Sequence, residues 1–247
     1  MINKEDFDCA FKILELQTNV LSLKLQQIKL GNYQYNKELK VLDSKLWMLM
    51  KSITKYDFIS CINSSDSLLV GEGNLSFTIS LMKKLQQLPR CITSTYEDYD
   101  DLSDAAKLNV SSLRKFGVNV LHNIDATKLH KTFNQNSFNT IIFQFPHSGS
   151  RDQIESLNPN YVLVRNFLTS ASYILKNLGV ILITIVDNDF YNSVFRFEEL
   201  SQELRISKPI KYKFDPKDYP EYIHTMTHQD ESAIEAYSKF ATWEFKL

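Results

Sequence analysis

Residues 68–77, LLVGEGNLSF, place Gly71 and Gly73 directly after a short apolar run. Glycine lets the backbone turn tightly off a strand and approach a ligand closely, because it has no Cβ. The free N–H groups of a following helix would face the same space, with Asn74 as the N-cap that accepts from one of them. Such a pair of glycines also occurs in ordinary turns, and Ser76 stands where the dinucleotide fingerprint has its third glycine. The pattern favours a nucleotide-type ligand.

Strands and helices are expected to alternate after this motif. The expected strands cover residues 68–70, 91–95, 118–121, 140–145 and 180–186, and the helices 75–88, 102–116, 128–133 and 160–177. Enrichment in β-branched residues and the glycine or proline stops support these elements. The alternation predicts a parallel sheet with helices on both faces.

Ligands of such sheets bind at the carboxyl ends of the strands. Glu97 follows the second expected strand, and Asp125 follows the third. A carboxylate at Glu97 can accept hydrogen bonds from both ribose hydroxyls, and one at Asp125 can accept from an exocyclic amine. Each acid alone can be a solvated loop residue. Together, and in this order, they predict a nucleoside-containing cofactor.

Residues 1–63 are expected to form a helical extension before a main domain of residues 64–247. The heptad seam of this extension has Phe11, Thr18, Leu25, Asn32, Leu39, Leu46 and Ile53 at its a-type positions, and its other apolar members include Leu14, Leu21, Leu42 and Leu49. Either one long helix pairs with another chain, or a hairpin turns at residues 31–36. A parallel homodimer would place Lys24 against Lys29, so we favour the hairpin. Either the extension only covers a flank of the main domain, or it docks a protein partner, the substrate or a second copy.

Composition and charge narrow the functional classes. The 247 residues are 43% hydrophobic and 23% charged, as in a soluble globular protein, and the net charge of −1 gives no general argument for nucleic acid. Cys9, Cys61 and Cys91 are too far apart for a zinc site and suit a reducing compartment. There is no apolar run near the ~18 residues that cross a bilayer and no signal peptide. An intracellular, cytoplasmic protein with no membrane partner is expected.

Six motifs occur in the order in which a known family has them: GEGNLSF, STYE, IDAT, IIFQFPHSG, NFLTSA and YPEYIHTMT. From about Leu68 to the C-terminus the chain resembles the Rossmann-like methyltransferase domain of fungal and plant large-subunit rRNA uridine-N3 methyltransferases, the BMT5-like family. The resemblance implies S-adenosylmethionine as cofactor, ribosomal RNA as substrate and, in a eukaryote, a possible nucleolar location. It also implies a class I methyltransferase sheet whose last strand, 240–245, is antiparallel. Gln144 departs from the family, which usually has asparagine there, and so do residues 187–191.

The resemblance and the strand ends together define the expected site. The expected cofactor-binding residues are Gly71, Glu72, Gly73, Asn74, Ser76, Glu97, Asp125, Ala126, Gln144, Phe145 and Pro146. The N3 atom of uridine is protonated at neutral pH, so a base or a polarising group must assist. His147 is the best candidate, unless it only hydrogen-bonds its loop. Tyr222 and His224 are expected to complete the acceptor pocket, without a metal.

Other functions fit the same residues less well. The chain could methylate a protein or a small molecule, or could bind S-adenosylmethionine without turnover as an interaction module. A nicotinamide dehydrogenase is disfavoured by Ser76 and Asp125.

Overall fold

The chain forms two compact units. The computed structural model describes residues 4–29, 37–63, 65–85, 90–150, 152–154, 156–224 and 236–247. The first unit comprises Met1–Lys55 with Ile210–Lys213, and the second comprises Tyr56–Pro209 with Phe214–Leu247. Each unit has its own packing, and each is described separately.

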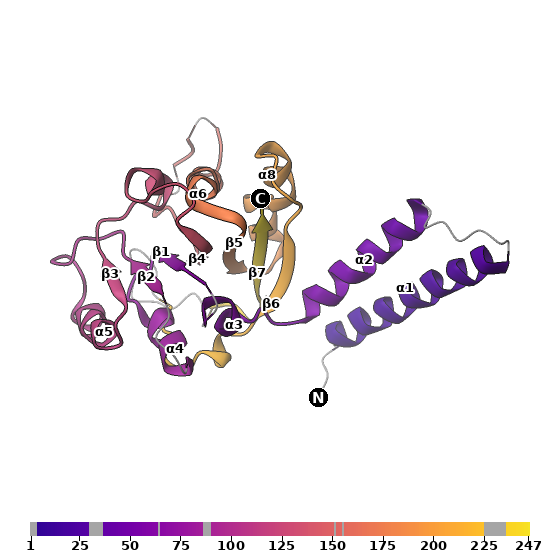
Figure 1. Cartoon of the computed structure of the whole chain (residues 1–247), viewed down its shortest axis with the longest axis horizontal. Coiled ribbons are helices and arrows are strands. Elements are labelled where there is room, and N and C mark those ends of the chain that lie inside the picture. Colours follow the sequence, from indigo (N-terminus) through magenta and orange to yellow (C-terminus); the bar gives the residue numbers. More distant parts are fainter. Residues whose placement is uncertain are drawn as a thin grey trace. The chain divides into compact units, whose positions relative to one another are not determined.

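The first unit contains a helical hairpin. Helices α1 (Lys4–Lys29) and α2 (Lys37–Ile53) lie antiparallel to each other (Figure 1). Lys24 of α1 forms an ion pair with Asp43 of α2, with 3.8 Å between Nζ and Oδ2. The predicted hairpin is therefore confirmed, and its predicted turn at 31–36 lies outside the described residues.

Helix α1 buries a different face from the predicted one. Its more buried side carries Ile13, Leu16, Val20 and Leu23. The apolar side chains of the predicted seam on α1 are between 58% and 62% exposed: Phe11, Leu14, Leu21 and Leu25. On α2 the seam residues Leu42, Leu46 and Leu49 are half-buried, as predicted. The seam was wrong for α1 because both of its apolar rows repeat at three- and four-residue spacing, and periodicity alone cannot choose between them.

The sheet has the predicted Rossmann-like topology. Its strands are β1 (Ser67–Val70), β2 (Cys91–Ser94), β3 (Asn119–Leu121), β4 (Phe138–Gln144), β5 (Leu175–Val186), β6 (Ile210–Phe214) and β7 (Phe240–Lys246). They follow the order β3-β2-β1-β4-β5-β7-β6. Strands β1 to β5 pair in parallel, and β7 pairs with β5 in the antiparallel direction. The antiparallel last strand is thus confirmed.

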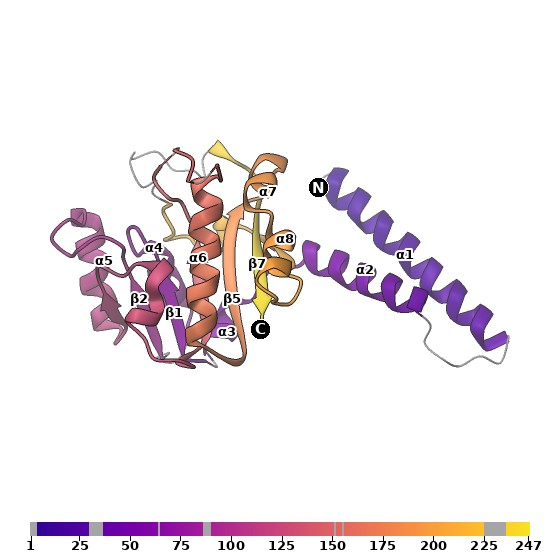
Figure 2. The same cartoon turned by 90° about the horizontal axis from the view of Figure 1, so that it is seen from above.

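Helices cover both faces of the sheet (Figure 2). One face packs against α6 (Pro159–Ile174), α7 (Asp189–Phe195), α8 (Phe197–Glu203) and the 3₁₀ helix η1 (Ala126–Lys131). The other packs against α3 (Phe58–Asn63), α4 (Ser76–Lys84) and α5 (Asp104–Lys115), and the short η2 (Pro216–Asp218) lies in the chain after β6. Phe58 and Ile62 of α3 are fully buried in the second core. Helix α3 therefore belongs to the second unit, although the sequence placed it in the extension.

The end of α6 differs from its prediction. The helix was expected to span 160–177 and to stop at Gly179, but Ile174 is its last residue. Leu175 adopts an extended conformation and pairs with Phe138 of β4, so β5 begins before the glycine. Pairing with a neighbouring strand therefore overrides the local stop signal.

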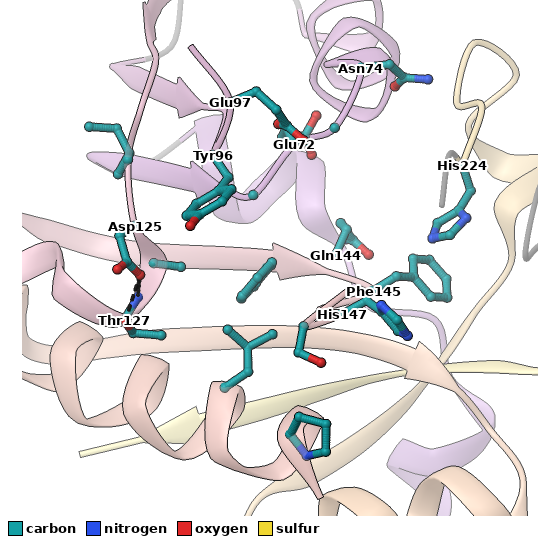
Figure 3. Close-up of a pocket in the computed structure, with 18 of the residues that line it drawn as sticks. Glu72, Asn74, Tyr96, Glu97, Asp125, Thr127, Gln144, Phe145, His147 and His224 are labelled. Atoms are coloured by element: carbon teal, nitrogen blue, oxygen red, sulfur yellow. Dashed lines mark hydrogen bonds between the residues drawn. The ribbon is translucent and has the colours of Figure 1, made fainter. Parts of the chain in front are cut away.

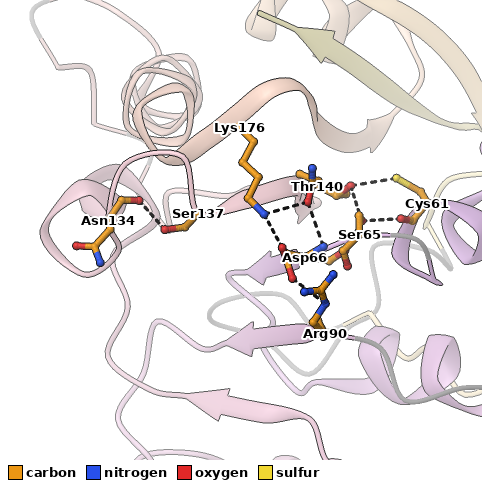
Figure 4. A network of polar contacts seen from close by, with 10 residues as sticks. Cys61, Ser65, Asp66, Arg90, Asn134, Ser137, Thr140 and Lys176 are labelled. Carbon is orange, nitrogen blue, oxygen red and sulfur yellow. Dashed lines mark hydrogen bonds and ion pairs between the residues drawn. The ribbon is translucent and has the colours of Figure 1, made fainter.

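A polar network fixes the amino ends of the central strands (Figure 4). Asp66 precedes β1 and forms ion pairs with Arg90, at 3.1 Å, and with Lys176, at 2.5 Å. The hydrogen bond from Lys176, aided by the charge of Arg90, lowers the pKa of Asp66 below its usual value. At the same edge the hydroxyl of Thr140 lies 3.2 Å from the Cys61 sulfur. These contacts hold the strand starts together, at the sheet edge opposite to the strand ends expected to bind ligand.

Candidate active site

A cleft of about 540 Å³ opens at the carboxyl ends of the central strands (Figure 3). It is lined by all but two of the predicted site residues: Gly71, Glu72, Gly73, Asn74, Glu97, Asp125, Ala126, Gln144, Phe145, His147, Tyr222 and His224. The volume lies within the range of small-molecule clefts. Lining residues that the sequence did not indicate include Asp101, Ser103, Ile154 and Asn166. They come from loops and helices whose approach to the strand ends depends on tertiary packing.

The glycine turn brings the backbone to the edge of the cleft. Gly71 has a φ of +65°, and a Cβ there would lie 2.4 Å from Cε2 of Phe143. The cap position of α4 is Leu75, with a φ of 64°, and not Asn74 as predicted. The side chain of Asn74 nevertheless accepts a hydrogen bond from the N–H of Ser76, at 3.0 Å. Asn74 therefore binds a free N–H at the start of α4, as predicted. It does so from one position before the cap, because Leu75 adopts the left-handed conformation between them.

Ser76 and Pro146, which the sequence assigned to the cofactor site, do not line the cleft. Ser76 is 3% exposed, and its hydroxyl donates to the carbonyl of Ile223 and accepts from the N–H of the same residue, at 3.0 and 2.9 Å. Asn74 adds a hydrogen bond to that carbonyl, at 2.8 Å. Through these two bonds, Ser76 holds the segment that contains Tyr222 and Ile223 next to the glycine turn. Glycine could not make these bonds, so the departure from the fingerprint has a structural reason.

Glu72 lies buried between the two glycines at the start of α4. Its carboxylate accepts hydrogen bonds from the N–H of Thr78, at 3.2 Å, and from the Thr78 hydroxyl, at 3.0 Å. Burial raises the pKa of Glu72 to about 7, and the bonds from Thr78 oppose this only in part. The folded protein thus holds this proton over a pH range in which the unfolded chain has lost it.

This shift predicts a pH-dependent loss of stability. The unfolded chain releases the Glu72 proton near its ordinary pKa of 4.5, and the folded chain releases it near 7. The Glu72 contribution to the free energy of unfolding is therefore intact below pH 4.5 and falls by about 3 kcal/mol as the pH rises through 7. Glu72→Gln should be more stable than the unmodified protein at pH 8 by a margin that shrinks toward pH 5. Urea unfolding at both pH values measures this, and an equal margin at both would contradict it.

Two carboxylates lie where the nucleoside of a cofactor was expected. Glu97 is half-buried after β2. Asp125 begins η1, where one carboxylate oxygen accepts from the N–H and the hydroxyl of Thr127, at 2.9 and 2.6 Å, and the other accepts from Lys128 at 2.7 Å. Desolvation acts to raise the pKa of Asp125, but the bonds from Lys128 and Thr127 outweigh it and hold that pKa below its usual value. Asp125 is thus a fixed carboxylate at the cleft wall.

Gln144 presents an unsatisfied carboxamide at the end of β4 (Figure 3). The residue is 8% exposed, and neither Oε1 nor Nε2 has a hydrogen-bond partner. A buried polar group without a partner costs about 1–3 kcal/mol, so such groups in native proteins require an explanation. The sequence indicated this position as a departure from its family, but it could not show that the side chain is buried and unpaired.

Aromatic rings gather beside Gln144. Phe145 has a φ of 48°, a strained conformation for a residue with a Cβ. Its ring centroid lies 4.8 Å from that of His224, and the Tyr222 ring lies 6.3 Å away at an interplanar angle of 28°. Burial, together with the charge of Glu72, raises the pKa of Tyr222 well above its usual value. Tyr222 is therefore a neutral phenol at physiological pH and not a base.

The two histidines differ in environment. His147 is exposed, and its Nδ1 accepts a hydrogen bond from the N–H of Gly149 at 3.0 Å. In the neutral ring this bond places the proton on Nε2, which can then donate. Burial, together with the charge of His147, lowers the pKa of His224 to about 4, and its Nδ1 has no hydrogen-bond partner. His224 is a neutral ring at pH 7.

The carboxylates among the described lining residues give the cleft an acidic character. Its described lining residues include the four acids Glu72, Glu97, Asp101 and Asp125, and no lysine or arginine. Such a lining suits a ligand that carries positive charge and disfavours one that carries phosphates.

A family model described as rRNA (uridine-N3-)-methyltransferase BTM5-like matches residues 68–226. The chain belongs to this BMT5-like family. The matched segment contains every residue that lines the cleft. The sequence resemblance is therefore confirmed, and with it the assignment to a family of methyltransferases whose cofactor is S-adenosylmethionine.

Individual proteins are similar to this chain over part of their length. An uncharacterized protein of Arabidopsis thaliana is 29% identical over 63% of this chain and 79% of its own length. Heavy metal-associated isoprenylated plant protein 41 of the same plant is 30% identical over 63% of this chain, and human ferredoxin-fold anticodon-binding domain-containing protein 1 is 31% identical over 45%. The matched regions cover only 32% and 18% of those two proteins. A solved SAM-dependent methyltransferase from Archaeoglobus fulgidus overlaps 90% of this chain and 98% of its own, with 11% identity and a TM-score of 0.47.

Within the described ranges, no group of three or more His, Cys, Asp or Glu side chains could hold a metal ion. Among the same residues, no helix has the length and apolarity that a membrane span requires.

Proposed function

We propose that this chain transfers a methyl group from S-adenosylmethionine to N3 of a uridine in RNA, with ribosomal RNA as the leading substrate. The observation that carries the acceptor part of the proposal is the buried, unpaired carboxamide of Gln144 at the mouth of the cleft. Family membership carries the cofactor part.

The cleft residues fit S-adenosylmethionine. When bound, this cofactor supplies an electrophilic methyl group on a positively charged sulfur. The backbone at Gly73 would border its amino-acid end, Glu97 would accept hydrogen bonds from the ribose, and Asp125 and the N–H of Ala126 would bind the adenine. The described lining contains no lysine or arginine that could bind a pyrophosphate, and this argues against a nicotinamide dinucleotide.

The carboxamide of Gln144 matches the imide edge of uracil. It offers one donor and one acceptor side by side, and uracil presents a carbonyl oxygen next to N3–H. Oε1 can accept from N3–H before transfer, but it must move away from N3 when the proton leaves, because the methyl group reaches N3 along the same direction in the ring plane. Nε2 can donate to the carbonyl, where negative charge accumulates as N3 loses the proton, and such placed donors assist catalysis strongly. The rings of Phe145 and Tyr222 provide surfaces on which the base can stack.

His147 suits a donor role better than that of a general base. In the neutral ring, the bond from Gly149 to Nδ1 places the proton on Nε2, and an Nε2–H group can donate to a uracil carbonyl. With a pKa of about 4, His224 is too weak a base to remove the N3 proton at neutral pH, and we assign it a positioning role through its unpaired Nδ1. The N3 proton can then leave to water at the exposed mouth of the cleft.

The partners and the location are part of the same proposal. The human relative is named for an anticodon-binding domain, which agrees with an RNA acceptor. A ribosomal RNA substrate, together with three cysteines that form no disulfide, favours an intracellular location, and in a eukaryote the nucleolus.

A tritium-transfer assay tests the proposed function directly. The chain is incubated with methyl-labelled S-adenosylmethionine and either total RNA, protein extract or no acceptor. We expect label in RNA, recovered as 3-methyluridine after digestion to nucleosides. Label in protein alone would show that the acceptor is a protein and not RNA. Cofactor binding without any transfer would indicate a non-catalytic module.

Asp125 provides a test of the cofactor's orientation. Asp125→Ala should weaken binding of adenosine and of S-adenosylhomocysteine by about 1–3 kcal/mol, because the carboxylate can no longer accept from the adenine amine. Binding of a methionine fragment should not change. Asp125→Asn is the matched control, since its amide oxygen can still accept from the N–H of Thr127 and cap η1. If adenosine binds Asp125→Ala as tightly as the unmodified chain, Asp125 serves only as a cap.

A further inference from the structure

Helix α1 carries an apolar stripe that α2 does not cover. The outer stripe consists of Phe11, Leu14, Thr18, Leu21 and Leu25, and its four apolar members are between 58% and 62% exposed. It lies on the side of α1 away from Ile13, Leu16, Val20 and Leu23, the row that packs in the hairpin. Large apolar side chains at strict 4-3 spacing form the seam of helix pairs in water. A row of this kind left exposed on a helix marks an interaction surface.

The charges beside the outer stripe differ between the two halves of α1. Asp8, Glu15 and Lys29 share one heptad position on one side of the stripe. Asp8 and Glu15 lie in the N-terminal half, and Lys29 lies at the C-terminal end. Lys24 borders the other side of the stripe in the C-terminal half. A helix with an acidic first half and a basic second half is complementary to a copy of itself that runs in the opposite direction.

We propose that the outer stripe binds the outer stripe of a second copy of this chain, with the two α1 helices antiparallel, so that two hairpins form a four-helix bundle. In the register that covers the stripe, Leu14 lies opposite the partner's Leu25, and Thr18 lies opposite the partner's Leu21. Asp8 then faces the partner's Lys29, and the symmetry of the pair repeats this contact at the other end.

The competing arrangements either bring like charges together or leave part of the stripe uncovered. A parallel pair places Lys24 against the partner's Lys29, and an antiparallel pair shifted by one heptad in one direction places Glu15 against the partner's Glu15. The opposite shift pairs Glu15 with the partner's Lys29 but leaves Phe11 and Leu14 beyond the end of the partner's α1. Exposed charges add little to affinity but select among such registers. Charge and coverage of the stripe together therefore favour one arrangement of two copies. This inference does not depend on the proposed methyl transfer.

Sedimentation velocity on the full chain tests the association. We expect a dimer at micromolar concentrations and a monomer for Leu14→Glu with Leu21→Glu, with at least a 10-fold rise in the dissociation constant. The matched control is Leu178→Glu, which changes an 88% exposed leucine of the second unit and should remain dimeric. Circular dichroism must show unchanged helix content in all three. A monomer at every concentration for the unmodified chain would overturn the proposal.

Charge reversal tests the direction of the pair. Lys29→Asp places like charges at both ends of the antiparallel pair and should weaken the dimer several-fold, whereas it would strengthen a parallel pair by facing Lys24. Asp8→Lys combined with Lys29→Asp should restore the affinity of the unmodified chain. A stronger dimer for Lys29→Asp alone, or no recovery in the double variant, would overturn the antiparallel arrangement.

Discussion

The variant Gly73→Val should lose cofactor binding while it stays folded. We expect the unmodified chain to bind S-adenosylhomocysteine with a Kd in the low micromolar range, about −8 kcal/mol, and the variant to bind at least about 100-fold more weakly. Gly73 lines the cleft and is not among the glycines with positive φ. A valine there should therefore fill the space for the amino-acid end of the ligand without left-handed strain. Titration calorimetry measures the loss.

Gly71 shows why the choice of glycine matters. At Gly71 a side chain would be strained by the φ of +65° and would strike the ring of Phe143, so its variants would damage the fold as well as the site. Ser111→Val, on the exposed side of α5, controls for adding a β-branched residue to the surface. Equal affinities for Gly73→Val and the unmodified chain would mean that the cofactor does not bind at this turn.

The topology of the second unit could be predicted from the sequence because each local signal agreed with the next. Short β-branched strands, glycine or proline stops and polar strand ends occur in one order, and the parallel order of β1 to β5 follows from it. The same order placed Glu97 and Asp125 at the cleft. The errors lie where tertiary contacts override local pattern. Leu175 belongs to β5 because it pairs with Phe138. Helix α1 has two apolar rows that could pack against α2, and the row that contains Val20 is the buried one.

The electrostatic state of the site could not be predicted in the same way. Ser76 was expected in the cofactor site, but its hydroxyl binds Ile223, 147 positions later in the chain. The unpaired carboxamide of Gln144 and the bond from Gly149 to His147 likewise depend on which atoms packing brings together. From the residue type alone, a histidine can be identified as a candidate for proton transfer. Only the hydrogen-bond partner of each ring nitrogen shows what that histidine can donate or accept.

The largest effect on turnover is expected from Gln144→Leu. Leucine is one carbon shorter than glutamine but likewise ends in a branch, and it can neither donate to a uracil carbonyl nor accept from N3–H. We expect the single-turnover rate of methyl transfer to fall by about 10²–10³, the usual loss when one donor to a developing oxyanion is removed. The Kd for S-adenosylhomocysteine should change less than twofold. Stability should move the other way, with a gain of about 1–3 kcal/mol in urea unfolding, because two buried unpaired polar atoms have gone.

Opposite changes in rate and stability distinguish an acceptor-binding residue from a structural one. If Gln144 only supported the fold through a contact with the cofactor, Gln144→Leu would weaken S-adenosylhomocysteine binding and lower the rate together.

His147→Gln and His147→Ala form a matched pair of variants that test the neighbouring donor. Glutamine keeps an N–H donor but cannot act as a base near neutral pH, so it should retain most of the rate that alanine loses if His147 polarises a carbonyl. Equal losses in both His147 variants, with loss of the pH limb near neutrality, would instead establish His147 as the base.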